Sequence, residues 1–356
     1  MPTYTTVSSL PYYDDSTEYV DRLTGLPQIV YFDSGIAADS TRPPQNTKIE
    51  TNNKRFDIIS AAPLFSLRFD ETGFALGKHC TPVSKTSSAL LEALERAMAE
   101  SPSIPALFDQ LGAFIRSEPD TASLPFTGGF IGYLAYDLGS ALETLPQQAL
   151  KDIDIPDLHL GFYSWACIVD HALRTTQLVT LNEEAEGLHS EIKRRLSTKN
   201  TQINNEKFFI NKALEPEINV ERYKDKHAEI QHLIFSGDCY QVNFTQRFSG
   251  SYSGSEWLAY KQLRKVMPGP FSAFYQPEKQ FAILSFSPER FIAVRHNTVL
   301  TQPIKGTSPR SAHPAIDRAN AESLQRSEKN RAENIMIVDL LRNDLGKSCI
   351  PGSIQV

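Results

Sequence analysis

The amino-acid sequence predicts an α+β fold rather than a doubly wound α/β sheet. The first half consists mainly of short runs rich in β-branched and aromatic residues, interrupted by Pro and Asn. In the second half, runs of the same kind follow one another from residue 271 to residue 304, and a helical pattern then covers about 328–345. Strands in antiparallel succession followed by helices indicate that the α and β segments are not interleaved.

The first half is expected to contain more strands than helices. Four runs predict strands, at 28–33, 55–60, 130–136 and 162–169. The last two are apolar throughout, as strands buried on both faces are. A polar stretch with Pro43 and Pro44 lies between the first two runs and predicts a surface loop. Helical composition covers 87–100 and runs into Pro102.

The second half begins with a helix whose two ends are both marked. Asn219 is an N-cap residue and Gly237 occupies the usual position after the last turn. The segment 238–248 is then expected to be a strand, because Tyr240 and Val242 would share one face with Phe244. A second helix is expected at 256–266. Further strands are predicted at 271–275, 281–287, 290–295 and 298–304.

The domain boundary is predicted from a change in composition. Between residues 181 and 212 the chain turns polar, which is typical of a solvated helix followed by a connection. We therefore expect an N-terminal region over residues 1–205 and a second region over residues 206–356.

Composition excludes several classes of function. The chain has 36 Lys+Arg against 42 Asp+Glu, a net charge of −6, so it lacks the basic face of a nucleic-acid binder. No apolar run approaches the roughly 20 residues of a membrane span. The first residues lack a basic segment followed by an apolar one, so no secretory signal is expected. We expect a cytoplasmic protein that binds neither nucleic acid nor membrane.

Metal and nucleotide motifs are weak. None of the four cysteines forms a CxxC pair, and His227 and His232 are five residues apart, which does not place them on one helical face. Free thiols and no histidine-based zinc site are therefore expected. The glycines of 128–132 lack the GxGxxG spacing of a dinucleotide site, and we interpret them as packing positions.

The chemistry-bearing side chains gather in residues 285–346. Glu289 lies at the junction of two apolar strands, and Lys305 lies where another strand breaks into Gly-Thr. The two are 16 residues apart, which fits adjacent strands that bring both groups to one pocket. Charges in apolar strands are costly unless paired or functional. The residues alone leave open a catalytic pair or a structural ion pair of Glu289 with Arg290 or Lys305.

The motifs of this region resemble one enzyme family. They are long and collinear, and they cover 236–248, 287–292, 303–307 and 331–346, with weaker matches at 31–35, 56–60 and 128–133. The chain resembles the chorismate-utilising synthases of the anthranilate synthase component I family over nearly its whole length. The resemblance implies large antiparallel β-sheets packed face to face with helices on the outside.

Lys305 selects a branch of this family, because anthranilate synthases have alanine there. The resemblance implies amination of chorismate at C4 to 4-amino-4-deoxychorismate, for p-aminobenzoate and folate. Lys305 would add at C2 while Glu289 protonates the departing 4-hydroxyl, which is otherwise a poor leaving group. A free lysine is neutral in only about one molecule in a few thousand at pH 7, so desolvation or a nearby cation would have to activate it. Gly306 and Thr307 would line the pocket.

The resemblance also implies a metal and a second ligand. Glu333 would be a ligand of Mg²⁺, which would hold a carboxylate of chorismate. Asp339 and Asp344 are expected to be groups of the helix surface instead. A tryptophan site would be formed by Ser34, Asn53, Lys54, Arg55, Phe56, Pro270, Phe271 and Ser272. The alternative interpretation of these residues is turn polar groups and core aromatics.

The implied partner is a glutamine amidotransferase subunit that supplies ammonia, because the sequence shows no Cys/His glutaminase arrangement of its own. Two alternatives stay open: anthranilate synthase component I, which aminates C2, and a non-catalytic module that binds tryptophan or the amidotransferase. Family members continue beyond the residues that match Val356, with a glycine-rich loop, an arginine and further magnesium-binding glutamates. We therefore expect a C-terminally incomplete active site, and no turnover by the 356-residue chain alone.

Overall fold

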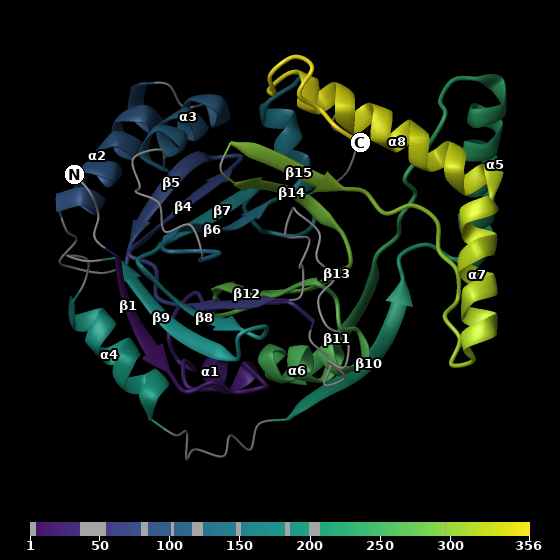
Figure 1. Ribbon diagram of the computed structural model, residues 1–356. Coiled ribbons are helices and arrows are strands. Elements are labelled where there is room, and N and C mark those ends of the chain that lie inside the picture. The colour runs from purple at the N-terminus through teal and green to yellow at the C-terminus, as the bar shows by residue number, and fades with distance from the viewer. Residues whose placement is uncertain are drawn as a thin grey trace. The chain divides into compact units, whose positions relative to one another are not determined.

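The computed structural model describes residues 5–35, 55–79, 85–100, 103–115, 124–146, 151–181, 186–198, 207–295 and 297–356. The chain forms two compact units. Figure 1 shows its helices and strands. Unit 1 comprises Met1–Ser197 together with Met267–Val356, and unit 2 comprises Thr198–Val266. The division into regions 1–205 and 206–356 stays a prediction. No helix among the described residues is long and apolar enough to cross a membrane.

A seven-stranded sheet is the largest element of unit 1. Its strands, in spatial order, are β1 (Thr5–Leu10), β9 (Thr175–Leu181), β8 (Trp165–Asp170), β3 (Phe56–Ser60), β2 (Val30–Asp33), β12 (Phe271–Glu278) and β13 (Phe281–Ser287). Every neighbouring pair is antiparallel. The sheet therefore combines strands from both halves of the sequence.

A four-stranded antiparallel sheet packs against it. Its strands are β5 (Gly73–Lys78), β4 (Phe65–Asp70), β7 (Leu158–Tyr163) and β6 (Gly129–Leu134). Val30 and Tyr275 of the larger sheet share one buried apolar cluster with Ile131 and Tyr163 of the smaller. The predicted packing of antiparallel sheets face to face is thus confirmed.

Helices cover the outer faces of both sheets (Figure 1). Leucines of α2 (Lys85–Glu100) and α3 (Ile104–Ile115) pack on β4 and β7. The helices α1 (Thr17–Asp21) and α4 (Glu186–Ser197) lie beyond the seven-stranded sheet, joined by a hydrogen bond from Arg22 to the Leu196 carbonyl. The remaining elements of unit 1 are η1 (Tyr136–Ala141), the ribbon β14 (Arg290–Arg295) and β15 (Thr298–Gln302), α7 (Pro314–Arg326) and α8 (Glu328–Gly346).

Unit 2 contains α5 (Val220–Ser236), α6 (Glu256–Val266) and an antiparallel ribbon of β10 (Phe208–Pro216) and β11 (Phe248–Gly254). The predicted ends of α5 are confirmed, because the Asn219 side chain accepts a hydrogen bond from the Arg222 amide and Gly237 follows the last turn. The predicted bounds of α6 are confirmed as well.

Two of the expected strands are wrong. Residues 238–247 contain no strand, and β11 begins only at Phe248. Alternation at Tyr240 and Val242 favours a strand only where a neighbouring strand pairs with it, and here the Phe244 ring instead lies 5.0 Å from that of Tyr223 on α5. The run 162–169 is two strands, because Ser164 is the corner at which the chain passes from one sheet to the other.

A buried histidine between the two sheets predicts a dependence of stability on pH. His159 Nδ1 lies 2.7 Å from the Tyr275 hydroxyl, and burial, with smaller contributions from His79 and Arg68, lowers the pKa of His159 to about 4. The unfolded chain, with an ordinary histidine pKa near 6.5, binds this proton more readily. Stability is therefore full above about pH 6.5, and as the pH falls toward 4 it drops by up to about 1.4 kcal/mol per pH unit.

Urea denaturation of the wild type and His159→Gln at pH 7, 6 and 5 checks this expectation. His159→Gln should lose part of the dependence of the unfolding free energy on pH. His227→Gln, on the exposed face of α5, should keep that dependence. Equal slopes for wild type and His159→Gln would contradict the assignment.

Candidate active site

Glu289 and Lys305 lie at the same end of the β14–β15 ribbon. The ribbon pairs Arg290 with Gln302, so Glu289 directly precedes one strand and Lys305 follows the other by three residues. The Ile304 amide donates a hydrogen bond to Glu289 Oε1 at 2.9 Å. The carboxylate is thereby held beside the backbone of the residue that precedes Lys305.

Glu289 forms neither of the ion pairs that the sequence left open. Among the described residues it has no ion pair with Arg290 or Lys305, and its carboxylate accepts a hydrogen bond from the Ile304 amide instead. Lys305 is half-buried and has no hydrogen bond or ion pair in the described part of the chain. No carboxylate of the described residues thus holds its amine.

Gly306 brings this end of the ribbon against two helices. Its φ of +77° is in the left-handed region that favours glycine. A Cβ at Gly306 would lie 3.0 Å from Asn330 Cγ and 3.1 Å from Leu324 Cδ1. Asn330 belongs to α8 and Leu324 to α7, so a side chain here would press on both helices, and the left-handed backbone would strain it as well. Thr307, next in the chain, is exposed.

Glu333 lies one turn beyond Asn330 on the same face of α8, because residues three apart are neighbours on a helix. It is half-buried and has no hydrogen bond or ion pair among the described residues. Those residues contain no group of three or more His, Cys, Asp or Glu side chains that could hold a metal. Glu333 therefore presents one carboxylate without a partner among the described residues, and those residues do not complete a metal site.

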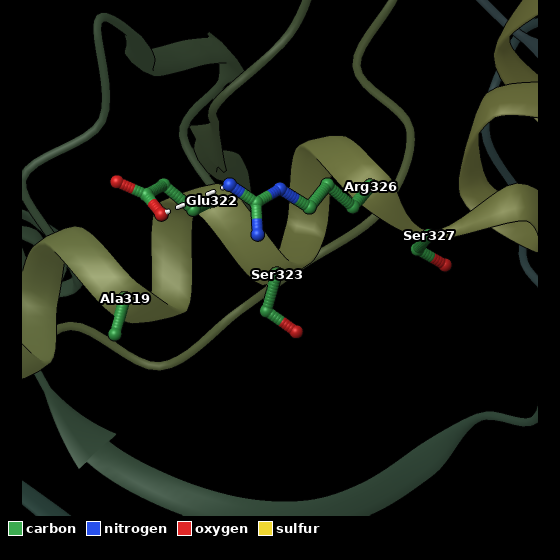
Figure 2. Close-up of a pocket in the computed structure, with 5 residues that line it drawn as sticks. All are labelled: Ala319, Glu322, Ser323, Arg326 and Ser327. Atoms are coloured by element: carbon green, nitrogen blue, oxygen red, sulfur yellow. Dashed lines mark hydrogen bonds and ion pairs between the residues drawn. The ribbon is translucent and has the colours of Figure 1, made fainter.

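The other acidic residues of α8 are surface groups, as expected. Asp339 pairs with Arg342 at 3.0 Å and Asp344 pairs with Lys347 at 3.2 Å, all with exposed side chains. A depression on α7 is lined by Ala319, Glu322, Ser323, Arg326 and Ser327 (Figure 2). Arg326 lies 3.4 Å from Glu322 there, and no predicted site residue contributes to the lining.

Most residues of the predicted tryptophan site lie at one end of three adjacent strands. β12 pairs Ser272 with Asp33, and β2 pairs Phe32 with Ile58. Continuing these registers places Ser34 opposite Phe271 on one side and opposite Phe56 on the other. Pro270 directly precedes Phe271, and Arg55 directly precedes Phe56. Arg55 forms a two-pronged ion pair with Asp170 at 2.9–3.2 Å. Asn53 and Lys54 lie outside the described residues.

A buried network around Asp57 adjoins this position, and no sequence pattern predicted it. Asp57 is 1% exposed and accepts hydrogen bonds from the Ser34 amide and hydroxyl at 2.8 and 2.7 Å and from the Ser16 hydroxyl at 2.5 Å. His171 Nε2 lies 2.8 Å from Asp57 Oδ2, the oxygen that also accepts the Ser16 hydroxyl, whereas both Ser34 groups bind Oδ1. Burial opposes ionisation, but the hydrogen bonds and charge of His171, together with those hydroxyls, hold the pKa of Asp57 below its usual range. Alternation alone marked 55–60 as a strand and gave no sign of this carboxylate.

Asp57→Asn is expected to lower the free energy of unfolding by about 1–3 kcal/mol, because an amide cannot accept all of these hydrogen bonds. Since the folded-state pKa is lowered, this stabilisation is present above the unfolded pKa near 3.9 and is lost as the pH falls below it. Urea denaturation at pH 7 and pH 3.5 measures the difference. The difference in unfolding free energy between the wild type and Asp57→Asn should shrink at pH 3.5. Asp225→Asn on exposed α5 should match the wild type at both pH values.

Comparison with known proteins identifies the family. A family model described as chorismate binding enzyme matches residues 78–356. Aminodeoxychorismate synthase component 1 of Salmonella typhimurium is 37% identical over 354 residues, which are 99% of this chain and 70% of that protein. The Escherichia coli protein of the same name is 37% identical over 352 residues, with 98% and 70% covered. The chain belongs to the chorismate-binding enzyme family.

The fold agrees with a solved structure. The crystal structure of anthranilate synthase component I from Streptococcus pneumoniae matches with a TM-score of 0.60 at 23% identity, over 88% of this chain and 65% of that one. The chain thus spans slightly less than two thirds of this structure and 70% of the curated relatives named above.

Proposed function

We propose that this chain contributes Glu289 and Lys305 to an active site that aminates chorismate at C4 to give 4-amino-4-deoxychorismate, which leads to p-aminobenzoate and folate. The observation that carries the proposal is the position of Glu289 and Lys305 at one end of the same ribbon. The 37% identity to proteins named aminodeoxychorismate synthase component 1 supports the same reaction.

In the first step, the Lys305 amine forms a bond to C2 of chorismate. The ring double bonds shift and the C4–O bond breaks, while Glu289 gives its proton to the departing oxygen, which leaves as water. This assignment is supported by the Lys305 amine, which has no carboxylate partner among the described residues, and by the Glu289 side chain, which the Ile304 amide orients.

In the second step, ammonia forms a bond to C4 as the C2–N bond to Lys305 breaks. The double bonds return and the lysine leaves as a neutral amine. The ammonium group now on C4 gives one proton to the Glu289 carboxylate. Both residues are thereby restored, and the sum of the two steps is chorismate plus ammonia to aminodeoxychorismate plus water. Gly306 and Thr307 follow Lys305 directly and are proposed to contact the substrate.

Magnesium enters the proposal through one residue. Mg²⁺ prefers oxygen ligands, often one or two carboxylates with water and substrate completing the shell, and when bound it would offset the charge of a chorismate carboxylate. Glu333 is proposed as one of its ligands. Its half-buried carboxylate, which has no partner among the described residues, supports this assignment.

Ammonia is proposed to come from a glutamine amidotransferase subunit, which the words "component 1" in the names of the relatives support.

We also propose that tryptophan binds where Ser34, Phe56 and Phe271 lie side by side at the ends of β2, β3 and β12. Isothermal titration with tryptophan tests this second proposal. Binding should be lost in Phe271→Ala and kept in Phe209→Ala, which alters an exposed ring in unit 2.

The reaction is tested by incubating the purified full-length protein with chorismate, Mg²⁺ and ammonium, and identifying the product by mass spectrometry. Aminodeoxychorismate is the expected product. Anthranilate would instead support amination at C2, the reaction of anthranilate synthase. No product, with tryptophan or the amidotransferase still bound, would support a binding module.

A further inference from the structure

The short connection that carries Glu289 is held at both ends by contacts with β12. It runs from Ser287, the last residue of β13, through Pro288 to Arg290, the first residue of β14. Ser287 pairs with Phe271 of β12 in the seven-stranded sheet. Arg290 places its guanidinium carbon 4.8 Å from the centre of the Phe271 ring. Phe271 thus contacts the residues on both sides of the connection.

The Ser287 side chain is turned toward Glu289. Its hydroxyl oxygen accepts a hydrogen bond from the Glu289 amide at 3.2 Å, and its proton is donated to the Glu289 carbonyl at 3.1 Å. Both backbone groups of Glu289 are therefore bound to one hydroxyl. A serine hydroxyl that closes a local turn in this way fixes the backbone of the residue two positions on.

The position of Ser287 is itself fixed by a close approach. A Cβ on Gly269 would lie 2.9 Å from the Ser287 carbonyl oxygen and 2.9 Å from Ser272 Oγ. The backbone at residue 269 therefore rests directly on Ser287. Ser272 is 2% exposed and donates its hydroxyl proton to the Gly269 carbonyl at 3.0 Å, which holds the glycine in place.

These contacts form a chain that ends on the carboxylate. The sheet and Gly269 fix Ser287, and Ser287 fixes the backbone of Glu289. The Ile304 amide then donates a hydrogen bond to the Glu289 side chain at 2.9 Å. Such supporting groups matter because a catalytic side chain must be held within about 0.5 Å of its productive position. We propose that Ser287 is a positioning residue that acts through Glu289. The proposal rests on the function proposed above only where Glu289 is taken as the acid.

A nuclear magnetic resonance titration tests the positioning without turnover. In protein labelled with ¹⁵N-isoleucine, the Ile304 amide signal is assigned by its loss in Ile304→Val. The chemical shift of this signal should change as the pH is lowered and the Glu289 carboxylate takes up a proton. Glu289→Gln should abolish this change, called the movement below. Ser287→Ala should at least halve the movement, because the carboxylate then spends less time on the amide. Ser287→Thr, which keeps the hydroxyl, should restore it.

Ser285→Ala is the matched control, because Ser285 lies two residues earlier on the same strand. It should leave the movement unchanged. Full movement in Ser287→Ala, or loss of movement in Ser285→Ala to the same extent, would overturn the proposal. If Ser287→Ala unfolds, Ser287→Cys, which supplies a weaker donor and acceptor in nearly the same volume, must fall between serine and alanine.

Kinetics of the full-length protein provide the second readout. Ser287→Ala should lower kcat by about tenfold, as expected for the loss of one or two modest hydrogen bonds, and should leave KM within about twofold. Ser287→Thr should recover most of the rate. A change confined to KM would overturn a role through Glu289. If the wild type makes no C4-aminated product, the proposed function fails while the titration still decides whether Ser287 positions the carboxylate.

Discussion

Replacing Lys305 with alanine is expected to abolish amination at C4, with kcat reduced on the order of 10³-fold or more. In the proposed reaction the lysine nitrogen forms a bond to C2, and alanine has no atom that can replace it. Lys305 is half-buried and makes no hydrogen bond or ion pair among the described residues, so its removal breaks no described polar contact. The variant should therefore fold normally.

The measurement is the rate of 4-amino product formation by the full-length protein with saturating ammonium. Lys279→Ala, in the exposed turn between β12 and β13, is the matched control and should retain wild-type activity. Lys305→Arg keeps a positive charge of similar reach but cannot supply a neutral amine at this pH. It should be as inactive as the alanine variant. An unchanged rate of 4-amino product in Lys305→Ala would rule out a covalent role for the lysine.

Glu289→Gln is expected to lower kcat by about 10²- to 10⁴-fold, the contribution typical of a general acid. Glutamine preserves the shape of the side chain, and its amide oxygen can still accept the Ile304 N–H that now binds Glu289 Oε1 at 2.9 Å. It cannot give a proton to the departing hydroxyl. The loss should therefore appear in kcat, with little change in KM or in the urea midpoint.

Rapid-quench measurement of a single turnover isolates the step in which the 4-hydroxyl leaves. Because the acid assists only the leaving group, a chorismate analogue with fluoride in place of the 4-hydroxyl should recover much of the rate in Glu289→Gln. Glu278→Gln at the exposed end of β12 serves as the control and should behave as the wild type does. If Glu289→Gln retains wild-type kcat with chorismate, the acid lies elsewhere.

Local signals predicted the elements whose ends are decided by local chemistry. The N-cap Asn219 and the glycine after the last turn gave α5 its correct bounds, and Pro268 follows the end of α6. The strands from Phe271 to Gln302 were also recognised, since successive antiparallel strands need only short turns.

Elements decided by distant partners were not predicted. Residues 238–247 have the alternation of a strand but no partner strand, so they stay unpaired. Ser164 divides a single apolar run between two sheets because Leu181 binds its carbonyl, a contact from another strand. The helix α7 was not expected, although Pro314 at its start is a usual first-turn residue.

The candidate site likewise contains residues that local motifs predicted and groups that only the folded chain brings together. Glu289, Lys305 and Glu333 were recognised as side chains within motifs. The Ile304 amide and the Ser287 hydroxyl were not, because their role depends on the register that pairs Arg290 with Gln302 and Phe271 with Ser287. A backbone amide has the same formula at nearly every position, so only the folded chain distinguishes the one that binds a carboxylate.

The order of strands in the larger sheet has a consequence for biosynthesis. β2 pairs with β12, joining Tyr31 to Phe274, so an early strand waits for a partner made after more than two hundred further residues. Until then, Val30 and Tyr31, which are fully buried in the finished sheet, belong to an open edge on the nascent chain. Closing so long a loop is entropically costly, and sheets of this kind form slowly. The larger sheet is accordingly expected to close only after β12 has been made.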